Sequence, residues 1–549
     1  MCDYIDALDS ACDYMYVYEI AETENGYKIP LILFTSDDIS DGATLEEAAD
    51  LINSAKTPRE VFFFTAQVHG NEPAPTEGHL AFAKKLATTS EGKAMLDDPQ
   101  VGAIILIPCL NPEGSVTFTR NNPITKNNMN RDYMQLFSIE IQSVVKAAHA
   151  FMPTVWADCH EDWVQTHETN SMYNPVISDE LTITGLKDIA VNGHGILNSA
   201  VSNKDKAKDG VIPTNDAILM AHKLMGSLNG RGLHAGLYMS YVNAGIAQQY
   251  AGVIGAYGFI IETYGIGTGK NNYERRTYSM ASALEDLITL TLEDGTVAQQ
   301  VADGRRATAE KGLVFDEEDQ IVLQSTLTRA NAASQLPVNK PIIYANGTMA
   351  QPENITIQNF YDTIVRSRAR ATAYVFSKDV ANASAILEML NMHDVEYCEL
   401  AAGTTLDLRR YSGDVTLASL GESASVTFNA GAYIVFTDSA LGDLVSVLFE
   451  PDNTDAGTEN AVSLSQMELL DVSDIYRSEE SYISRTLGFR EMLGDIDHSF
   501  SLENADITLL VRILAGFDVE LDLGQRADLN ADGKLNNRDA IELIRALAE

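Results

Sequence analysis

Short runs of large apolar residues, separated by stretches with helical periodicity, dominate the first 312 residues and constrain the fold most strongly. The amphipathic stretch 137–150 is one example of the helical segments that lie between the runs. The runs are Val61–Phe64, Ala103–Ile107, Thr154–Trp156 and Phe259–Ile261. Strands that alternate with helices predict an α/β fold with a mixed, doubly wound sheet and helices on both of its faces. In such folds, ligands bind in the loops beyond the carboxyl ends of the strands.

The length and the charge of the chain limit its classes of function. At 549 residues the chain exceeds the size of one hydrophobic core and should divide into several domains. Its 78 acidic and 38 basic side chains give a formal net charge of −40, and such a surface repels nucleic acid and anionic lipid. No apolar run reaches the roughly 18 residues of a membrane span. We therefore expect neither a nucleic-acid partner nor a membrane span.

A polar motif directly follows the first apolar run. Within it, His69 and Glu72 lie three residues apart, so an imidazole nitrogen and a carboxylate can bind one cation. Zinc accepts such ligands, and a catalytic zinc site needs a third protein ligand and one position left for water. The run that begins at Thr154 ends in His160, and the nearby Asp158 can orient this imidazole. The sequence therefore predicts a metal site made by His69, Glu72 and His160.

Two other segments follow the second and the last run. Arg120, Asn130 and Arg131 come after the second run, and a guanidinium group matches a carboxylate with two parallel hydrogen bonds. Glu262 ends the wholly apolar run Phe259–Ile261. Burial there would raise the pKa of its carboxyl group and suit it to carry a proton.

Taken in order along the chain, these residues resemble the motifs of the zinc carboxypeptidase family. The resemblance covers about residues 14–312 and includes Asn111–Gly114. Within the family, the chain is similar to a bacterial subgroup that has an Asn-Arg-Asp segment and a C-terminal β-rich extension. It implies one catalytic zinc ion, held by His69, Glu72 and His160. It also implies a peptide substrate with a free C-terminus.

The same resemblance implies roles for the remaining residues. Arg120 would polarise the scissile carbonyl and stabilise the oxyanion. Asn130 and Arg131 would bind the C-terminal carboxylate of the substrate. Glu262 would act as general base and acid, taking a proton from the zinc-activated water and passing it to the leaving amine. Tyr250 would bind the substrate as the capping tyrosine of the family.

The chain departs from the family pattern at several positions. Glu113 stands where the family usually has aspartate. Asn128 stands where the family often has an aspartate that accepts a hydrogen bond from the first zinc histidine. An amide can accept that bond without supplying the charge, so we expect a lower zinc affinity. Tyr241 is the alternative to Tyr250 for the capping role.

The character of the sequence changes after residue 312. Apolar or alternating stretches such as 425–428 and 432–436 predict a small β-rich accessory domain over residues 313–486. Residues 487–549 contain an internal repeat, in which Asp495–Ala515 aligns with Asp528–Ala548 at an offset of 33 residues. Each copy has a polar loop followed by an amphipathic helix. Together with the zinc carboxypeptidase-like domain of residues 1–312, this division gives three domains.

The polar loop of the second copy matches a calcium loop. Such a loop binds the ion through side-chain oxygens at positions 1, 3, 5 and 12 and a backbone carbonyl at position 7. These positions hold Asp528, Asn530, Asp532, Asp539 and, at position 7, Lys534. The first copy keeps Asp495, Asp497, Ser499 and Asp506. Phe500 replaces the glycine of the sharp turn there, so we expect weaker calcium binding by the first copy.

The duplicated unit resembles a dockerin, a small all-α module that binds structural calcium. This resemblance implies that the partner is a cohesin domain on a cellulosome-type scaffoldin, and that the protein is extracellular. The first residues lack the basic and apolar segments of a secretory signal. Secretion would then mean that a signal peptide is absent from this sequence.

Three functions stay open from the sequence. The first is a secreted metallocarboxypeptidase. The second is a zinc amidase or deacylase related to aspartoacylase-like enzymes, which would not require a free α-carboxylate in its substrate. The third is a catalytically silent binding module, whose function would survive replacement of Glu262.

Overall fold

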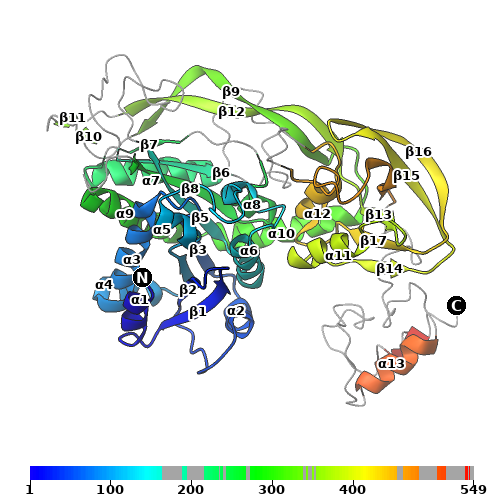
Figure 1. Ribbon diagram of the computed structural model, residues 1–549, viewed down its shortest axis with the longest axis horizontal. Helices are drawn as coiled ribbons and strands as arrows, with labels where there is room; N and C mark the ends of the chain where they lie inside the picture. The colour runs from blue at the N-terminus through cyan, green and yellow to red at the C-terminus, as the bar shows by residue number, and fades with distance from the viewer. Residues whose placement is uncertain are drawn as a thin grey trace.

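The computed structural model describes 1–163, 188–194, 216–233, 235–238, 243–266, 273–337, 342–343, 349–350, 354–453, 461–480 and 504–514, with five single positions between 538 and 544. Figure 1 shows two large bodies side by side, joined by a helix and bridged by a long β-hairpin. Among the described residues, no helix is long and apolar enough to span a membrane.

An eight-stranded mixed sheet forms the first body. Its four central strands are parallel to one another. At one edge β2 is antiparallel to β4 and to β1, and at the other edge β6 is antiparallel to β8 and parallel to β7. In sheet order the strands are β1 (Met15–Glu22), β2 (Lys28–Phe34), β4 (Val101–Ile107), β3 (Glu60–Ala66), β5 (Val155–Trp163), β8 (Tyr257–Ile266), β6 (Ile189–His194) and β7 (Ala235–Leu237). The four runs predicted as strands correspond to β3, β4, β5 and β8. The prediction of a mixed α/β fold is confirmed.

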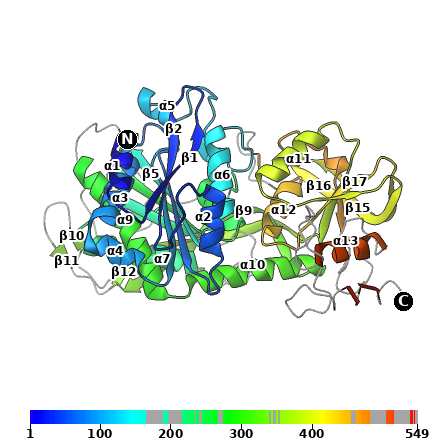
Figure 2. The same ribbon diagram turned by 90° about the horizontal axis from the view of Figure 1, so that it is seen from below.

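Helices cover both faces of this sheet, because its buried side chains alternate between two cores. Phe63 and Trp156 face one core, whereas Phe62, Phe64 and Val155 face the other. On the first side lie α2 (Leu45–Asn53), α6 (Ile139–Phe151) and α8 (Ala247–Val253). On the second side lie α1 (Cys2–Asp9), α3 (Pro73–Thr88), α4 (Ser90–Leu96), α7 (Asp216–Gly230) and α9 (Tyr273–Asp294). Figure 2 shows α3 and α4 on one side of the strands and α2 and α6 on the other.

The second body is a six-stranded antiparallel sheet with two helices. In sheet order its strands are β14 (Cys398–Leu400), β17 (Ala432–Phe436), β13 (Ala373–Ser377), β18 (Tyr476–Ser478), β15 (Thr404–Asp414) and β16 (Leu417–Phe428). The helices are α11 (Ala383–Met392) and α12 (Gly442–Phe449), which the sequence analysis did not anticipate. Apolar side chains of both helices belong to the same continuous core as α6 and α8 of the first body. The two bodies therefore share buried surface.

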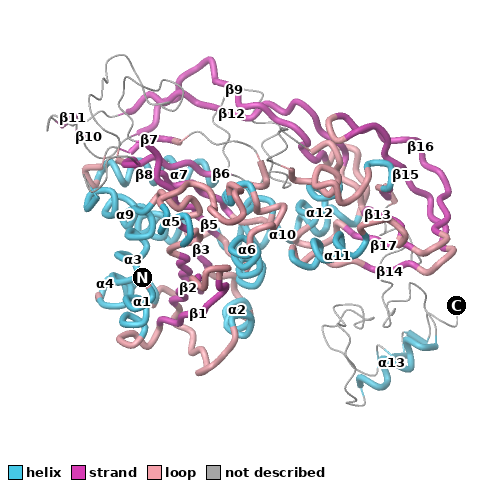
Figure 3. The backbone as a smooth tube through the Cα atoms, viewed as in Figure 1, coloured by secondary structure: helices cyan, strands magenta, loops and turns pink. Residues whose placement is uncertain are grey.

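Two further elements connect the bodies. Helix α10 (Val297–Leu313) runs from the first body to α12, where Gly312 lies against the backbone of Thr437. A long hairpin is formed by β9 (Gln320–Pro337) and β12 (Asn354–Ala369), and it runs across the first body in Figure 3. Near its tip, β10 (Ile342–Ile343) pairs with β11 (Met349–Ala350) and lies against α7.

Of the duplicated C-terminal unit, the structure describes α13 (Asn504–Leu514) and five helical positions near residue 540. Leu510, Ala540 and Leu543 pack into one small apolar cluster. Leu510 and Leu543 are equivalent positions of the repeat. The side chains of the predicted calcium loops, including that of Asp506, lie outside the described residues.

Candidate functional site

The first half of the site comes from the turn between β3 and α3. Gln67 begins the turn with a positive φ of 54°, and its side-chain amide donates to the Gly70 carbonyl at 3.0 Å. Gly70 has no room for a side chain, since an added Cβ would lie 2.0 Å from the backbone of Gly114. This close approach holds His69 inside the protein and places Glu72 at the N-cap of α3.

The second half of the site comes from β5 and β8. These strands are parallel neighbours, and their register sets His160 directly beside Glu262. Because β3 is the other neighbour of β5, the carboxyl ends of all three strands meet at one edge of the sheet. This is the edge at which α/β folds bind their ligands.

The three predicted metal ligands lie together, with His69 and His160 on either side of the Glu72 carboxylate. His69 Nδ1 lies 2.7 Å from one Glu72 carboxylate oxygen, and His160 Nδ1 lies 3.0 Å from the other. One ligand atom of each residue lies within 4.8 Å of those of the other two, and all three side chains are buried. Among the described residues, this is the only group of three or more such side chains that could hold a metal ion.

Both imidazoles are held from behind by an oxygen atom. His69 Nε2 donates to Asn128 Oδ1 at 2.9 Å, and His160 Nε2 donates to Asp158 Oδ2 at 2.6 Å. The other Asp158 oxygen accepts from Thr65 Oγ1 at 2.9 Å. Asp158 and Asn128 thus lie in contact with the two imidazoles for which the sequence predicts them as partners. Both Nδ1 atoms face the same point, the carboxylate of Glu72.

Burial and charge shift the pKa values of these groups in opposite directions. Burial lowers the pKa of the His69 imidazole. Burial also opposes the charged form of His160, but the carboxylates of Asp158 and Glu72 outweigh it and raise its pKa well above the usual value. Burial raises the pKa of the Glu262 carboxyl well above its usual value, and the nearby Glu72 adds to this rise. The site therefore combines a carboxyl suited to carry a proton with a surplus of negative charge around two imidazoles.

Arg120 is the cation of the site that reaches solvent. Its guanidinium donates to Glu72 at 2.9 Å, while half of its side chain stays exposed. The backbone carbonyl of Arg120 accepts from Gly70 N at 3.2 Å and from the Asn111 side chain at 3.3 Å. Asn111 also accepts from Gly114 N at 2.8 Å. The Asn-Pro-Glu-Gly segment thus fixes the chain that carries Arg120 against the His69 turn.

Asn130 and Arg131 lie on the other side of His160. The Asn130 amide nitrogen is 3.0 Å from His160 Nε2, and its oxygen accepts from Ala247 N at 3.1 Å. Arg131 is partly exposed, and its guanidinium donates to the Asn130 carbonyl at 2.6 Å. Asp132 accepts from the backbone of Phe137 and Ser138, so it holds the loop that enters α6.

The structure contradicts the substrate-binding role predicted for Tyr250. The Tyr250 side chain is fully buried between the two bodies. Its hydroxyl lies 2.8 Å from both His149 Nε2 and His393 Nδ1, and its ring packs near Trp156. Such a side chain has no surface to offer a substrate. The alternative candidate, Tyr241, lies outside the described residues.

One buried ion pair beside His160 has no signal in the local sequence. Glu161 follows His160 on β5 and is fully buried, where it accepts from Ala74 N at 3.2 Å and pairs with Arg276 of α9. Arg276 leaves no space for a side chain at Gly265. The pair ties β5, α3 and α9 together behind the site.

The chain is similar in sequence to known carboxypeptidases. The sequence model of the zinc carboxypeptidase family matches residues 1–172. Carboxypeptidase 2 of Trichophyton equinum is 24% identical over 419 residues, which are 71% of this chain and 71% of that protein. Carboxypeptidase 2 of Trichophyton rubrum is 22% identical over the same length and the same shares of both chains.

Solved structures of carboxypeptidases also match. A metallo-carboxypeptidase from Burkholderia cenocepacia has 16% sequence identity and a TM-score of 0.37, covering 53% of this chain and 68% of that one. A metallo-carboxypeptidase from Pseudomonas aeruginosa covers the same shares at 13% identity and a TM-score of 0.37. At the level of enzyme class, the family match and the curated relatives confirm the prediction of a zinc metallopeptidase of the carboxypeptidase type.

Proposed function

We propose that this protein is a zinc-dependent exopeptidase that removes C-terminal residues from peptides, with His69, Glu72 and His160 as the zinc ligands. The observation that carries the proposal is the convergence of two imidazole Nδ1 atoms and one carboxylate on a single buried point. Two nitrogens and one carboxylate are a ligand set of catalytic zinc sites.

The residues around this point fit a divalent cation. Each imidazole donates a hydrogen bond from Nε2, the nitrogen that faces away from Glu72, to an oxygen atom. Metal-binding histidines in proteins are commonly oriented in this way. Glu72, Asp158 and Glu262 bring three carboxyl groups into one buried space, where Arg120 pairs with Glu72 from the solvent side. The raised pKa of His160 means that its ring holds a second proton readily, and a bound metal ion would displace that proton.

Zinc bound here would supply a Lewis acid that polarises a carbonyl oxygen and lowers the pKa of water to about 7. Glu262 carries the proton chemistry. Its carboxyl is buried beside His160, and burial keeps its pKa high enough to accept a proton and return it to the leaving amine near neutral pH.

The two arginines act on opposite ends of the reacting bond. Arg120 is half exposed and can leave Glu72 to donate to the oxygen on which negative charge develops. Arg131 supplies a partly exposed guanidinium for the C-terminal carboxylate of the substrate, and Asn130 supplies an amide next to it. Arg131 and Asn130 together would select substrates with a free C-terminus.

Mass spectrometry of peptide mixtures tests this function. The mixture contains matched peptides with free and amidated C-termini, and the zinc-loaded protein is compared with Glu262→Gln. We expect stepwise loss of C-terminal residues only from the free-acid peptides, and a rate lower by about 10²–10⁴-fold in the variant. The control Glu274→Gln removes an exposed carboxylate from α9 and should leave the rate unchanged.

Two outcomes contradict the proposal. Equal cleavage of amidated and free peptides would show that no C-terminal carboxylate is recognised. Hydrolysis of N-acyl amino acids without any peptide cleavage would instead identify a deacylase.

We further propose that residues 487–549 form a calcium-dependent docking module of a secreted protein, with a cohesin domain as partner. The proposal is supported by the duplicated loop sequences and by the packing of the equivalent Leu510 and Leu543 in one cluster. Asp528, Asn530, Asp532 and Asp539 would hold one calcium ion. Titration of the apo protein with calcium should show one tight site, which Asp528→Ala with Asp532→Ala abolishes. Unchanged calcium binding in that double variant would overturn it.

A further inference from the structure

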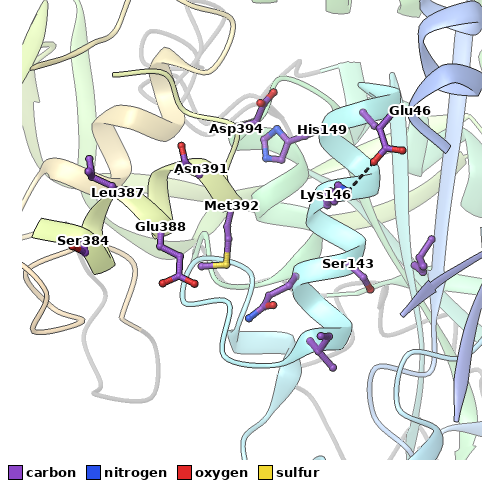
Figure 4. Close-up of a pocket in the computed structure, with 14 residues that line it drawn as sticks. Glu46, Ser143, Lys146, His149, Ser384, Leu387, Glu388, Asn391, Met392 and Asp394 are labelled. Carbon is purple, nitrogen blue, oxygen red and sulfur yellow. Dashed lines mark ion pairs between the residues drawn. The ribbon is translucent and has the colours of Figure 1, made fainter. Parts of the chain in front are cut away.

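A cavity lies between the two bodies, where α6 of the first body faces α11 of the second. It has a volume of about 840 Å³, within the range of small-molecule sites. Helix α6 forms one wall and helix α11 with the loop after it forms the other, as Figure 4 shows. The apolar part of the lining includes Ile139, Leu387 and Met392.

The cavity has an excess of negative charge. Its lining holds the carboxylates of Glu46, Glu388 and Asp394 but only one ammonium group, that of Lys146. Lys146 is already paired with Glu46 at 2.8 Å. Within the described part of the chain, Glu388 and Asp394 form no ion pair. Burial raises the pKa of the Asp394 carboxyl, so its ionised form would gain from a nearby cation.

The cavity also has an unused hydrogen-bond acceptor, His149, whose side chain is more than nine-tenths buried. His393 Nε2 donates to the Met134 carbonyl at 3.1 Å, so its Nδ1 accepts from the Tyr250 hydroxyl. The Tyr250 oxygen in turn accepts from His149 Nε2.

Burial lowers the pKa of His393 to about 4 and that of His149 to about 3, so both rings are neutral and this order of donors is fixed. His149 Nδ1 is therefore an acceptor, and it has no hydrogen-bond partner among the described residues. A ligand of this cavity should bring an N–H donor.

We propose that this cavity is a binding site for a small organic cation that carries N–H donors, an alkylammonium or an alkylguanidinium. Its charged end lies near Glu388 and Asp394 of the α11 wall and His149 of the α6 wall, which Figure 4 labels. Its alkyl chain contacts Met392, Leu387 and Ile139. The source is either a free amine or the side chain of a lysine or arginine in a peptide.

Calorimetric titration of the full-length protein with agmatine tests this proposal. Agmatine carries a guanidinium and an ammonium on a short alkyl chain, and pentanol serves as the uncharged counterpart. We expect saturable binding of agmatine at near-physiological ionic strength and none of pentanol. Nα-acetylarginine amide, titrated in parallel, shows whether an arginine side chain within a peptide is accepted as well as a free cation.

Variants assign the binding to the cavity. Glu388→Gln with Asp394→Asn should raise the Kd for agmatine about tenfold or more, because two carboxylates near the cation are lost. The matched control Glu396→Gln with Glu422→Gln removes two exposed carboxylates outside the cavity and should leave the Kd unchanged. Met392→Trp fills the space and should weaken binding without removing charge.

Three results would overturn the proposal. They are no saturable binding by the wild-type protein, equal Kd values in the cavity double variant and its control, and tight binding that survives Met392→Trp. Each would show that the cavity does not bind agmatine and that any attraction comes from the net negative charge of the chain.

Discussion

Two pairs of buried histidines in this protein face an oxygen atom, and only the first pair contains a ring whose pKa is raised. His69 and His160 flank the carboxylate of Glu72, with ring centroids 5.0 Å apart. His149 and His393 flank the hydroxyl of Tyr250, in the core that joins the two bodies. All four rings are buried.

The central group and its neighbours decide the behaviour of each pair. At His149 and His393, burial is the largest influence and lowers the pKa of both rings, so they serve as neutral links. Around Glu72, the carboxylate of Asp158 adds to that of Glu72 and raises the pKa of His160 despite its burial. The comparison teaches that burial lowers the pKa of a histidine unless more than one carboxylate faces its ring, as at His160.

The largest effect should follow removal of the central carboxylate of the first pair. Glu72→Ala should abolish stoichiometric zinc binding and lower peptidase activity by about 10³-fold or more, since the metal supplies several kcal/mol of transition-state stabilisation. Zinc content after gel filtration and peptide cleavage measure the two effects. Glu77→Ala, at an exposed position of the same helix, is the control. Full zinc content in Glu72→Ala would place the metal elsewhere.

The partners behind the two rings should differ in their effect on zinc affinity. Asp158→Asn should weaken zinc binding about 10–100-fold, whereas Asn128→Asp should strengthen it by up to about tenfold, because the added charge increases the basicity of His69. Competition with a chromophoric chelator measures affinity independently of activity. Asn121→Asp adds the same charge at an exposed position nearby and should change little. A weaker zinc affinity in Asn128→Asp would contradict the charge argument.

Sequence patterns identified the first pair but not the second. His69 and His160 each follow an apolar strand closely, so the local sequence predicts where their side chains meet. Asp158 and Asn128 could be identified for the same reason. Asp158 lies two residues before His160, and Asn128 lies two residues before the Asn130–Arg131 pair. The pattern of residues along β3, β4, β5 and β8 likewise predicts the sheet and the covering of both of its faces.

The role of Tyr250 depends instead on a contact that no local pattern contains. Its partner His393 follows α11, 143 residues later in the chain. The burial of Glu161 has the same kind of cause, because its partner Arg276 lies 115 residues away. Burial of a polar residue depends on which distant helix packs over it, and a sequence without helix-packing information predicts exposure by default.

Removal of the central hydroxyl of the second pair should affect stability and leave activity intact. Tyr250→Phe leaves a donor on His149 and an acceptor on His393 without partners, which costs about 1–3 kcal/mol of unfolding free energy. Urea denaturation measures this loss, and Tyr27→Phe at an exposed turn is the control. A stably folded Tyr250→Phe protein with more than about tenfold lower kcat/KM would return Tyr250 to the substrate site.

The second pair should also make stability depend on pH. The folded-state pKa of His393, about 4, lies below the unfolded value of about 6.5, so the unfolded chain binds more protons in between. The unfolding free energy is therefore fully maintained above pH 6.5 and falls as pH decreases toward 4, by up to about 1.4 kcal/mol per unit for this group. His393→Gln should lose stability less steeply over the same interval in urea denaturation. Parallel pH profiles for both proteins would contradict a neutral His393.

X-ray absorption at the zinc K edge tests the central claim most directly, because it counts the ligands of the bound metal. We predict nitrogen and oxygen scatterers at about 2.0–2.2 Å, with the outer-shell pattern of two imidazoles in the wild-type protein and of one in His160→Phe. A sulfur scatterer at about 2.3 Å, or an imidazole pattern unchanged by His160→Phe, would contradict the assignment of His69, Glu72 and His160 as the zinc ligands.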